Sequence, residues 1–551
     1  MGTERRMSGD VLVVGGGMAG CYAAIKASQQ GANVILADKG YVGKSGQSPY
    51  ANCIMAFDPD KGHNLDDWMR YINKTSEYVN NRYWTERTIE ESTAIFQELT
   101  SWGVQFKPYV DGPERFSSAP KGISKPRGYD PAELSQILRD QLVKYEVKIF
   151  DRVMISELLK QNGRVIGAIG IAVDNDDIFI FTAKTTILCV GACGYKPPGF
   201  PAILQLTCDG EAMAYRAGAE IGGKEFVDTH YTRMEIPCTT GRMHPSVEID
   251  ELFGRYTGYE IFKELYNVEG QRINIRPKGA SEYLFTYLQM DIEAHAGRAP
   301  VVWRTTCDNE TVGGATLGMS LRKADGLWPA SAECASTLPG LYAAGDSLYT
   351  LNNGAVYALI GSAVGGSAVT GAIAGKAAAK DALEFGELVV ENDVVEQSKK
   401  AVLAPVEQKG GYSPRWVTQL LQNTMMPYFI LYIKKADRLQ ATQTIISFIQ
   451  EHLVPQLYAR NPHELRLAHE TKNMVLSALM RLKSCEFRTE SRGNHYREDY
   501  PRRDDENWLA WTKISNVQGD MKLSKEPIPK EWWPDLSEPY EERYPFRFPG
   551  E

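Results

Sequence analysis

Three glycines and one acid near the start of the chain have the types and spacing that suit dinucleotide binding. Gly15, Gly17 and Gly20 form a Gly-x-Gly-x-x-Gly pattern, and Asp38 follows 18 residues after Gly20. Glycines here let the backbone approach a pyrophosphate, and the N-terminus of the next helix favours its negative charge. An acid at this spacing accepts a hydrogen bond from a ribose hydroxyl. The competing interpretation is a glycine turn that only packs a helix on a strand.

The flanking residues predict the elements that would position this chemistry. Residues 11–14 are apolar and predict a short buried strand that leads directly into the glycines. Residues 21–26 belong to an alanine-rich helix, and residues 33–37 predict a second strand that ends at Asp38. Strand, glycine turn, helix and acid occur in the order of the dinucleotide fingerprint, so we predict a bound adenine dinucleotide.

The loop directly after Asp38 supplies further candidate contacts. It contains Lys39, Lys44, Ser45 and Gly46, which are small residues and lysines just beyond the acid. These residues could continue the contact with the cofactor. A plain turn is the alternative.

Composition and charge exclude several classes of protein. The chain has 551 residues, of which 43% are apolar and 24% charged, as in an ordinary globular protein of several domains. Its net charge of −8 argues against nucleic-acid binding, which needs a basic face. We expect no membrane span: residues 347–375 are uncharged but rich in glycine, alanine and serine, and favour a buried helix lying against a cofactor.

The nine cysteines predict no metal site and no iron–sulfur cluster in this chain. They show no Cys-x-x-Cys pair and no ferredoxin spacing. Cys189 and Cys193 are the closest pair in sequence, and we interpret them as small core residues in a buried-strand pattern. Scattered thiols fit a reducing cytoplasm, which we expect as the location of the protein.

The rest of the chain predicts an α/β domain followed by helices. Strand patterns occur at residues 147–150, 165–171, 178–181 and 186–190, and helices are predicted at 64–105, 130–145, 205–223 and 358–380. Helical periodicity dominates from about 385 to 485. The last sixty or so residues are charged, aromatic and proline-rich and predict an extended tail, whose apolar side chains either wrap their own protein or meet a partner.

Five patches along the chain resemble the succinate dehydrogenase/fumarate reductase flavoprotein family, which includes the α subunit of adenylylsulfate reductase. The resemblance rests on motifs spread over nearly the whole sequence, the last of them highly specific. They are the fingerprint with Asp38-Lys39; Thr207-x-Asp209-Gly210 with Ala217-Gly218-Ala219; Glu225-Phe226-Val227-x-x-His230; residues 339–346, which end in Gly345-Asp346; and residues 491–508.

This resemblance implies a fold and a cofactor. It implies FAD rather than a nicotinamide cofactor, in a Rossmann-like FAD-binding domain of the two-dinucleotide-fold type, interrupted by an inserted α+β capping domain and followed by a C-terminal helical domain. It further implies Asp209, Gly345, Asp346, Gly361 and Ser362 as cofactor contacts, and an iron–sulfur (ferredoxin-like) electron-transfer partner. We expect these boundaries: FAD-binding domain 1–233 and 326–384, capping domain 234–325, helical domain 385–510 and tail 511–551.

Departures from the family motifs bear on how FAD is attached and on which substrate is bound. The segment that carries a flavin-linking histidine in membrane-bound members is Lys44-Ser45-Gly46-Gln47-Ser48 here, so FAD should be non-covalent. The arginine that holds a substrate carboxylate in the family is replaced by Leu359. Two carboxylates in a dry site need fixed cations, so this loss argues against fumarate or succinate as substrate. Loose spacing similarities favour the adenylylsulfate reductase branch.

Three residues are the candidates for catalysis. His230 and Arg233 lie where the family faces substrate above the flavin, and Lys278 is a basic group of the expected capping domain. A histidine can donate a proton, and basic side chains can hold a small anionic substrate. A satisfied core histidine and solvated charges are the alternatives. Two functions remain open: an enzyme acting on a C=C bond or a sulfur-type group, and a non-catalytic subunit whose FAD relays electrons.

Overall fold

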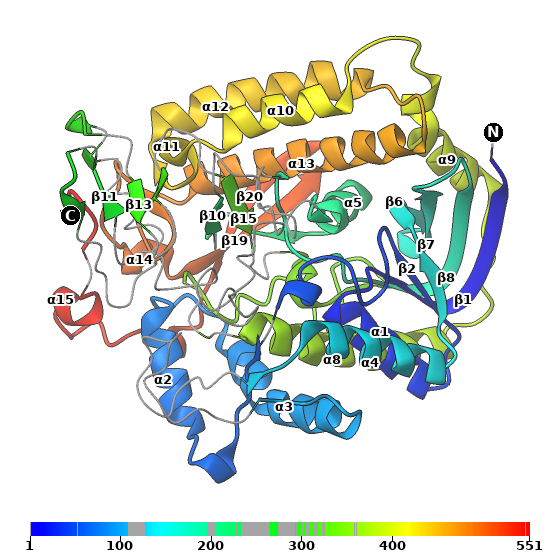
Figure 1. The fold of residues 1–551 in the computed structure, drawn as a ribbon, viewed down its shortest axis with the longest axis horizontal. Helices are drawn as coiled ribbons and strands as arrows, with labels where there is room; N and C mark the ends of the chain where they lie inside the picture. Colours follow the sequence, from blue (N-terminus) through cyan, green and yellow to red (C-terminus); the bar gives the residue numbers. More distant parts are fainter. Residues whose placement is uncertain are drawn as a thin grey trace.

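The apolar residues 11–14 form the fully buried end of strand β1 (Glu4–Val14) in the computed structural model. Around this strand the chain assembles a mixed sheet, a layer of helices and a helical bundle (Figure 1). The structure describes residues 2–51, 53–107, 127–196, 205–226, 229–232, 265–267, 269–273, 292–293, 295–298, 302–304, 309–311, 318–321, 326–356, 359, 361–545 and 547–551.

The central sheet of the described chain has the strand order β5-β2-β1-β8-β7-β6, with β16 paired to β8. Strands β1, β2, β5, β8 and β16 run parallel. Strand β7 pairs antiparallel with both β8 and β6. Their bounds are β2 Val34–Asp38, β5 Lys148–Asp151, β6 Val153–Gln161, β7 Arg164–Ala172, β8 Ile178–Leu188 and β16 Leu341–Ala343. Parallel pairing brings the carboxyl ends of β1, β2, β8 and β16 to one edge, which is where such sheets bind ligands.

Helices cover one face of the parallel strands. Helix α1 (Met18–Gln29) follows the glycine turn and packs against α8 (Ser362–Glu384), the small-residue helix. A methyl group on Gly371 would lie 2.4 Å from the carbonyl oxygen of Ala19, so the glycine is needed for this close approach. The expectation of a buried helix in this stretch is therefore confirmed, and its expected contact with a cofactor stays a prediction.

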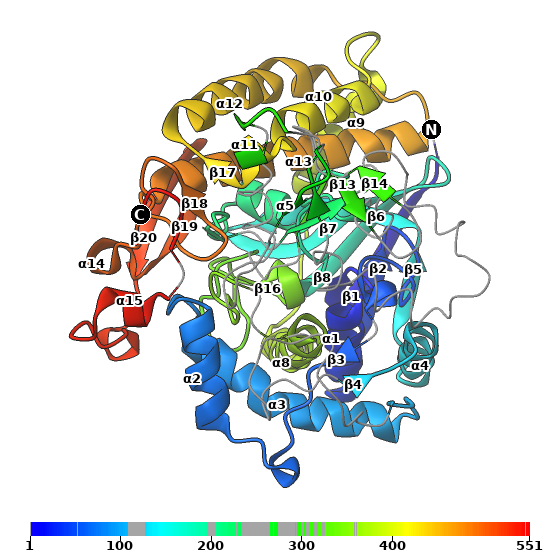
Figure 2. The same cartoon turned by 60° about the vertical axis from the view of Figure 1, so that its left-hand side comes forward.

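Three more helices complete this side of the molecule. They are α2 (Leu65–Thr75), α3 (Arg82–Ser101) and α4 (Pro131–Lys144). Each begins at a side-chain cap of the expected kind: Asn64, Asn81 and Asp130 accept from backbone N–H groups of the first turn. Figure 2 shows α1 and α8 nearly end-on between α3 and the sheet. In the described part of the chain, no helix is long and apolar enough to cross a bilayer.

A helical bundle lies on the opposite side of the sheet from α1 and α8 (Figures 1 and 2). Its long central helix α13 packs against α10, α12 and α5. The helices are α5 Asp209–Ala217, α9 Asn392–Glu407, α10 Pro414–Met425, α11 Tyr428–Leu431, α12 Ala436–Phe448 and α13 Pro462–Phe487. Helix α5 lies between α13 and the sheet, so it connects the two parts.

Short strands and turns make up the remaining described elements. Strands β3 (Cys53–Ile54) and β4 (Arg127–Gly128) pair, as do β17 (Ile433–Lys434) and β18 (Tyr496–Arg497). Strand β10 (Thr229–Thr232) lies at the end of the first expected FAD-binding segment and pairs with β15. In the region expected to form the capping domain, the described strands are β11 Leu265–Tyr266, β12 Arg272–Ile273, β13 Val302–Arg304, β14 Asn309–Thr311 and β15 Gly318–Leu321. The predicted domain boundaries themselves stay predictions.

The end of the chain differs from the extended tail predicted from sequence. Strands β19 (Ala510–Val517) and β20 (Asp520–Pro527) form a hairpin, and β19 also pairs with β9 (Ile221–Gly222). Short helices α14 (Asp505–Trp508) and α15 (Tyr540–Arg543) flank it. The final residues bury Tyr544 and Phe548 against the rest of the chain, so they wrap their own protein.

Candidate functional site

The glycine turn after β1 has the tight geometry that the sequence predicted. Gly15 adopts a left-handed backbone (φ 98°), and a methyl group on it would lie 2.4 Å from the carbonyl oxygen of Cys189. A methyl group on Gly20 would lie 1.7 Å from the carbonyl oxygen of Gly15. Gly17 caps helix α1, with only the Ser48 hydroxyl near its missing side chain. These glycines therefore bring the start of α1 against the ends of β1 and β8.

Asp38 lies directly beside this turn at the end of β2. Its two carboxylate oxygens accept hydrogen bonds from the backbone N–H of Gly16 and of Gly40, both at 2.6 Å. A carboxylate offers about four lone-pair positions, so each oxygen keeps capacity for a further donor. The side chain is thus fixed in orientation and can still accept from ribose hydroxyls, as the fingerprint requires.

The loop after Asp38 folds back toward the N-terminus of α1. The Ser45 hydroxyl is buried and donates to the Tyr41 carbonyl, whereas Lys44 is exposed. Gly46 has a left-handed backbone, and its N–H donates to Gln205. The sequence analysis missed Ser48, whose hydroxyl accepts from the Met18 N–H at 3.0 Å and so completes the cap of α1.

One polar atom of this loop is left without a protein partner. The Nε2 atom of Gln47 is buried and has no hydrogen-bond partner in the described structure. A buried donor without an acceptor costs free energy, so a bound group with carbonyl or ring-nitrogen acceptors would stabilise it. Gln47 lies in the segment Lys44-Ser45-Gly46-Gln47-Ser48, which contains no histidine that could bond to the flavin.

The second predicted contact region lies at the end of β16 and at the start of α8. Gly345 has φ 62°, its N–H donates to the Thr370 hydroxyl, and the half-buried Asp346 follows in the same turn. Gly361 has φ 81° and caps α8, while the buried Ser362 hydroxyl donates to the Leu359 carbonyl. The Ser347 hydroxyl links this turn to the end of β8 by accepting from the Val190 N–H.

Lys39 and Asp209 were both predicted to contact the cofactor, and in the structure they form an ion pair with each other. The Lys39 ammonium donates to Asp209 at 2.8 Å and to Glu470 at 3.2 Å. Lys196 pairs with the other oxygen of Glu470. Burial alone would raise the pKa of Glu470, but the charges of Lys39 and Lys196 outweigh burial and lower this pKa to about 2. Glu470 lies on α13, so the cluster ties the cofactor-binding part to the helical bundle.

The two lysines of this cluster respond differently to burial. The charges of Asp209 and Glu470 outweigh burial and raise the pKa of Lys39. Burial dominates for Lys196, whose pKa is lowered although it pairs with Glu470. The difference follows from the number of partners, because Lys39 has two carboxylates and Lys196 has one. No local sequence signal pointed to Glu470.

Of the three predicted catalytic residues, only the backbone of His230 lies among the described residues. The backbone of His230 lies in β10, where it pairs with Ser320 of β15, and its side chain is not among the described ones. Arg233 and Lys278 lie outside the described residues altogether. Their roles stay predictions.

The motif at residues 491–508 forms a buried network of charges. Arg492 donates to both oxygens of Glu490 and to Asp505, all at 2.8 Å, and Arg488 donates to Glu490 and Glu225. Each guanidinium is completely buried and paired, which is the condition under which buried charges are tolerated. This arrangement gives the motif a structural role, because it joins the segment after α13 to Glu225 and to Asp505 of α14.

His495 and Arg497 belong to the same motif, and their residue types would suit either a structural or a functional role. Arg497 donates to Asp499 and to the carbonyls of Cys485 and Glu486, at the end of helix α13. His495 is completely buried, and its Nε2 lies 3.2 Å from the Arg488 carbonyl. Burial and nearby cations lower the pKa of His495 well below its ordinary value, so it stays neutral. These contacts favour the structural role for Arg497.

Two family models match this chain in the order expected from the fold. The FAD binding domain matches residues 10–237, and the fumarate reductase flavoprotein C-terminal domain matches residues 418–544. Together these matches cover more than half of the chain. The chain belongs to the succinate dehydrogenase/fumarate reductase flavoprotein family. The predictions of FAD as cofactor and of an FAD-dependent oxidoreductase are thereby confirmed.

Relatives of this flavoprotein have similar lengths. It is 25% identical to a subunit of the CoM/CoB fumarate reductase of Methanothermobacter marburgensis over 89% of this chain and 94% of the relative. It is also 25% identical to the fumarate reductase flavoprotein subunit of Mycobacterium tuberculosis over 95% of this chain and 98% of the relative.

Solved structures show the same fold at lower identity. Mycobacterium smegmatis Sdh1 superposes with a TM-score of 0.80 at 23% identity over 95% of each chain. Adenylylsulfate reductase from Archaeoglobus fulgidus gives 0.75 at 20% identity over 96% of this chain and 97% of that one. These likenesses confirm the predicted FAD-binding, capping and C-terminal helical architecture. The assignment to one branch of the family stays a prediction.

The described residues fit FAD well. The glycines leave room at the start of α1, Asp38 keeps free acceptor capacity, and the buried Gln47 amide has no protein acceptor among the described residues. Bound FAD would supply reversible two-electron transfer. The N–H groups at the start of α1 would hold its pyrophosphate, and Asp38 would accept from its ribose.

Proposed function

We propose that this flavoprotein exchanges electrons between non-covalent FAD and an iron–sulfur partner, and thereby reduces or oxidises a small anionic substrate. The observation that carries the proposal is the convergence of Gly15, Asp38 and Gly345 at one edge of the parallel sheet, next to the ends of β8 and β16. A flavin held there needs a supply of electrons and a substrate site.

The surroundings of Leu359 favour a substrate other than a dicarboxylate. Leu359 stands where the family motif has a carboxylate-binding arginine, and it is buried in an apolar cluster with Met55, Phe57 and Trp68. A dicarboxylate brought against this cluster would lose solvation without gaining a cation. Our first candidate is a sulfur-type anionic group, held by Arg233 and Lys278 with His230 as proton donor.

A soluble C=C reductase is the second candidate within the enzyme class. It is favoured by the names of the two sequence relatives described above, both of which are fumarate reductase subunits. A non-catalytic subunit whose FAD only relays electrons is the candidate from a different class, motivated by the loss of the carboxylate-binding arginine at Leu359. The three proposals differ in which acceptor reoxidises the reduced flavin.

The distribution of cysteines supports a separate electron-transfer partner. Buried free thiols occur at Cys21, Cys189, Cys193, Cys208, Cys334 and Cys485. The described residues bring together only one group of metal-ligand type, with two thiols. A cubane or two-iron cluster needs four ligands, mostly thiolates. Free thiols also support our expectation of a reducing cytoplasm.

Anaerobic reoxidation of the reduced, FAD-loaded protein tests the proposal. We expect fumarate to react slowly and a sulfur-type anionic acceptor to reoxidise the flavin rapidly. His230→Ala should slow this step about 100-fold or more, with FAD content unchanged, because proton donation is lost. The exposed His295 provides the matched control, and His295→Ala should react like the parent protein.

Three other results would change the assignment. Rapid reoxidation by fumarate would favour the C=C reductase. Failure of every acceptor, together with rapid exchange with a low-potential iron–sulfur protein, would favour the relay. Absence of exchange with any iron–sulfur donor would overturn the proposed partner.

Release of FAD by acid precipitation provides a separate test of the cofactor linkage. The loop Lys44-Ser45-Gly46-Gln47-Ser48 contains no histidine that could bond to the flavin. We therefore expect all of the flavin in the supernatant after precipitation with acid, measured by its absorbance and fluorescence. Yellow precipitated protein would show a covalent bond to another residue and would contradict the prediction.

A further inference from the structure

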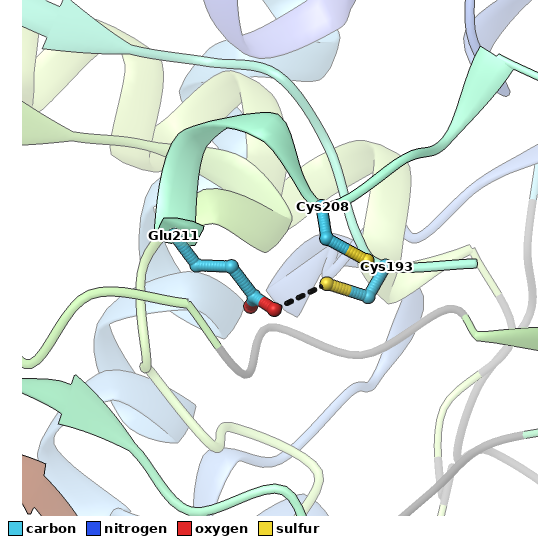
Figure 3. Close-up of side chains that lie close together, drawn as sticks. All are labelled: Cys193, Cys208 and Glu211. Atoms are coloured by element: carbon cyan, nitrogen blue, oxygen red, sulfur yellow. Dashed lines mark hydrogen bonds between the residues drawn. The ribbon is translucent and has the colours of Figure 1, made fainter. Parts of the chain in front are cut away.

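Three potential metal ligands meet in the interior between the end of β8 and the start of α5 (Figure 3). Cys193 lies in the segment after β8, Cys208 precedes α5, and Glu211 lies in its first turn. Their ligand atoms all lie within 4.8 Å of one another, and Cys193 Sγ is 2.6 Å from Glu211 Oε1. All three side chains are buried. The pair closest in sequence, Cys189 and Cys193, is thus not the pair that shares a ligand group.

The groups around these ligands are those expected around a metal ion. The Lys224 ammonium donates to the second oxygen of Glu211, and the Ser477 hydroxyl donates to Cys193 Sγ at 3.3 Å. Ligating carboxylates and thiolates in metal sites are oriented by such hydrogen bonds. Ser477 comes from α13, so the outer contacts reach the helical bundle.

The charges of the cluster also fit a divalent cation. Without metal, the Glu211 carboxylate and the Lys224 ammonium balance each other, and the neutral Cys193 thiol donates to Glu211. One divalent ion that displaces two thiol protons leaves the net charge of the cluster at zero. The exchange therefore adds no uncompensated charge to the interior.

The backbone at Cys208 provides an independent observation. Cys208 has φ 63° and ψ 23°, in the left-handed region that side chains other than glycine and asparagine rarely adopt. Its side chain makes no capping hydrogen bond to α5. A thiol is thus held at a position whose conformation suits glycine, directly beside a second thiol and a carboxylate. Strained backbone of this kind is concentrated at ligand-binding sites.

We propose that Cys193, Cys208 and Glu211 bind a divalent soft metal ion, zinc in the simplest case. Two thiolates and one carboxylate are ligands that zinc accepts, with a fourth position for water or a nearby hydroxyl. The Cys193 proton that now points to Glu211 leaves on binding, and sulfur and oxygen move about 1 Å apart to fit zinc bond lengths. The ion would join the cofactor-binding edge to α5. Sequence spacing alone predicted no metal here.

Metal analysis of the FAD-loaded protein tests this proposal. After treatment with a chelator and addition of zinc, we expect one zinc ion per chain. Cys208→Gly should fold, because glycine suits this backbone, and should lose about ten-fold or more in zinc affinity. Cys193→Ser should behave likewise. Cys334→Ser removes a buried cysteine outside the cluster and is the matched control, with zinc binding unchanged.

Cobalt replacement gives a second readout that is independent of activity. Tetrahedral cobalt with thiolate ligands absorbs at wavelengths longer than oxidised flavin, and this absorption should appear in the parent protein and be lost in Cys208→Gly. FAD content is measured on the same samples, so loss of the cofactor is distinguished from loss of the metal. Zinc content equal in the parent protein and Cys208→Gly, or no zinc in either, would overturn the proposal.

Discussion

Replacement of Gly20 by alanine is expected to abolish retention of FAD and to reduce the yield of folded protein. The added methyl group would lie 1.7 Å from the Gly15 carbonyl oxygen, less than half of an ordinary contact distance. The backbone fixes the positions of both the added methyl group and the carbonyl oxygen. The clash can therefore be relieved only by moving α1 away from the glycine turn. We expect a loss of about 3 kcal/mol or more in the free energy of unfolding. The FAD-to-protein ratio after gel filtration and the thermal unfolding midpoint measure the effect.

Gly386→Ala is the matched control for this experiment. No heavy atom lies within 4 Å of a methyl group added at Gly386, and its backbone is not left-handed. This variant should keep both the FAD content and the unfolding midpoint of the parent protein. Retention of FAD in Gly20→Ala at the level of this control would show that α1 can shift without losing the cofactor, which would contradict the proposed geometry.

The sequence predicted the cofactor-binding edge because its determinants are local. Gly15, Gly20 and Asp38 lie within one βαβ unit, and each has a backbone or spacing requirement that few residues meet. The structure places all three together at one edge. The small-residue helix α8 was also predictable, since Gly371 and Gly375 are tolerated in a long helix only where another backbone approaches closely.

Strand β6 escaped the sequence analysis for an identifiable reason. Its pairing with β7 shifts register between Ile155 and Glu157, so the alternation of side chains is interrupted in mid-strand. Both faces are also covered, with Met154 and Val153 in different hydrophobic clusters. A strand buried on both faces and interrupted by a bulge shows no period of two.

Clusters assembled from distant segments could not be predicted from one sequence. Glu470 meets Lys39 across 431 positions of the chain, and Cys193 meets Ser477 across 284. Periodicity and local motifs contain no information on such pairs. For the same reason, the sequence motifs predicted Lys39 and Asp209 as cofactor contacts but gave no sign that the two side chains are hydrogen-bonded to each other.

Glu470→Gln is expected to destabilise the junction between the cofactor-binding part and the helical bundle. Glu470 is buried and accepts hydrogen bonds from the ammonium groups of Lys39 and Lys196. An amide cannot balance these two cations, and breaking a buried ion pair on one side costs about 3–5 kcal/mol. We expect a lower thermal midpoint at neutral pH, with the exposed Glu451→Gln as a control that leaves it unchanged.

The pH dependence of this effect has a definite sign. The pKa of Glu470 is about 2 in the folded protein and 4.5 for the free group, so folding favours the ionised form. Its stabilisation, on the order of 3 kcal/mol, is therefore fully present above pH 4.5 and is lost as the pH falls toward 2. The unfolding free energy of the parent protein should fall through this window more steeply than that of Glu470→Gln. Parallel curves would contradict the prediction, because they would show that Glu470 does not change protonation between the folded and unfolded states.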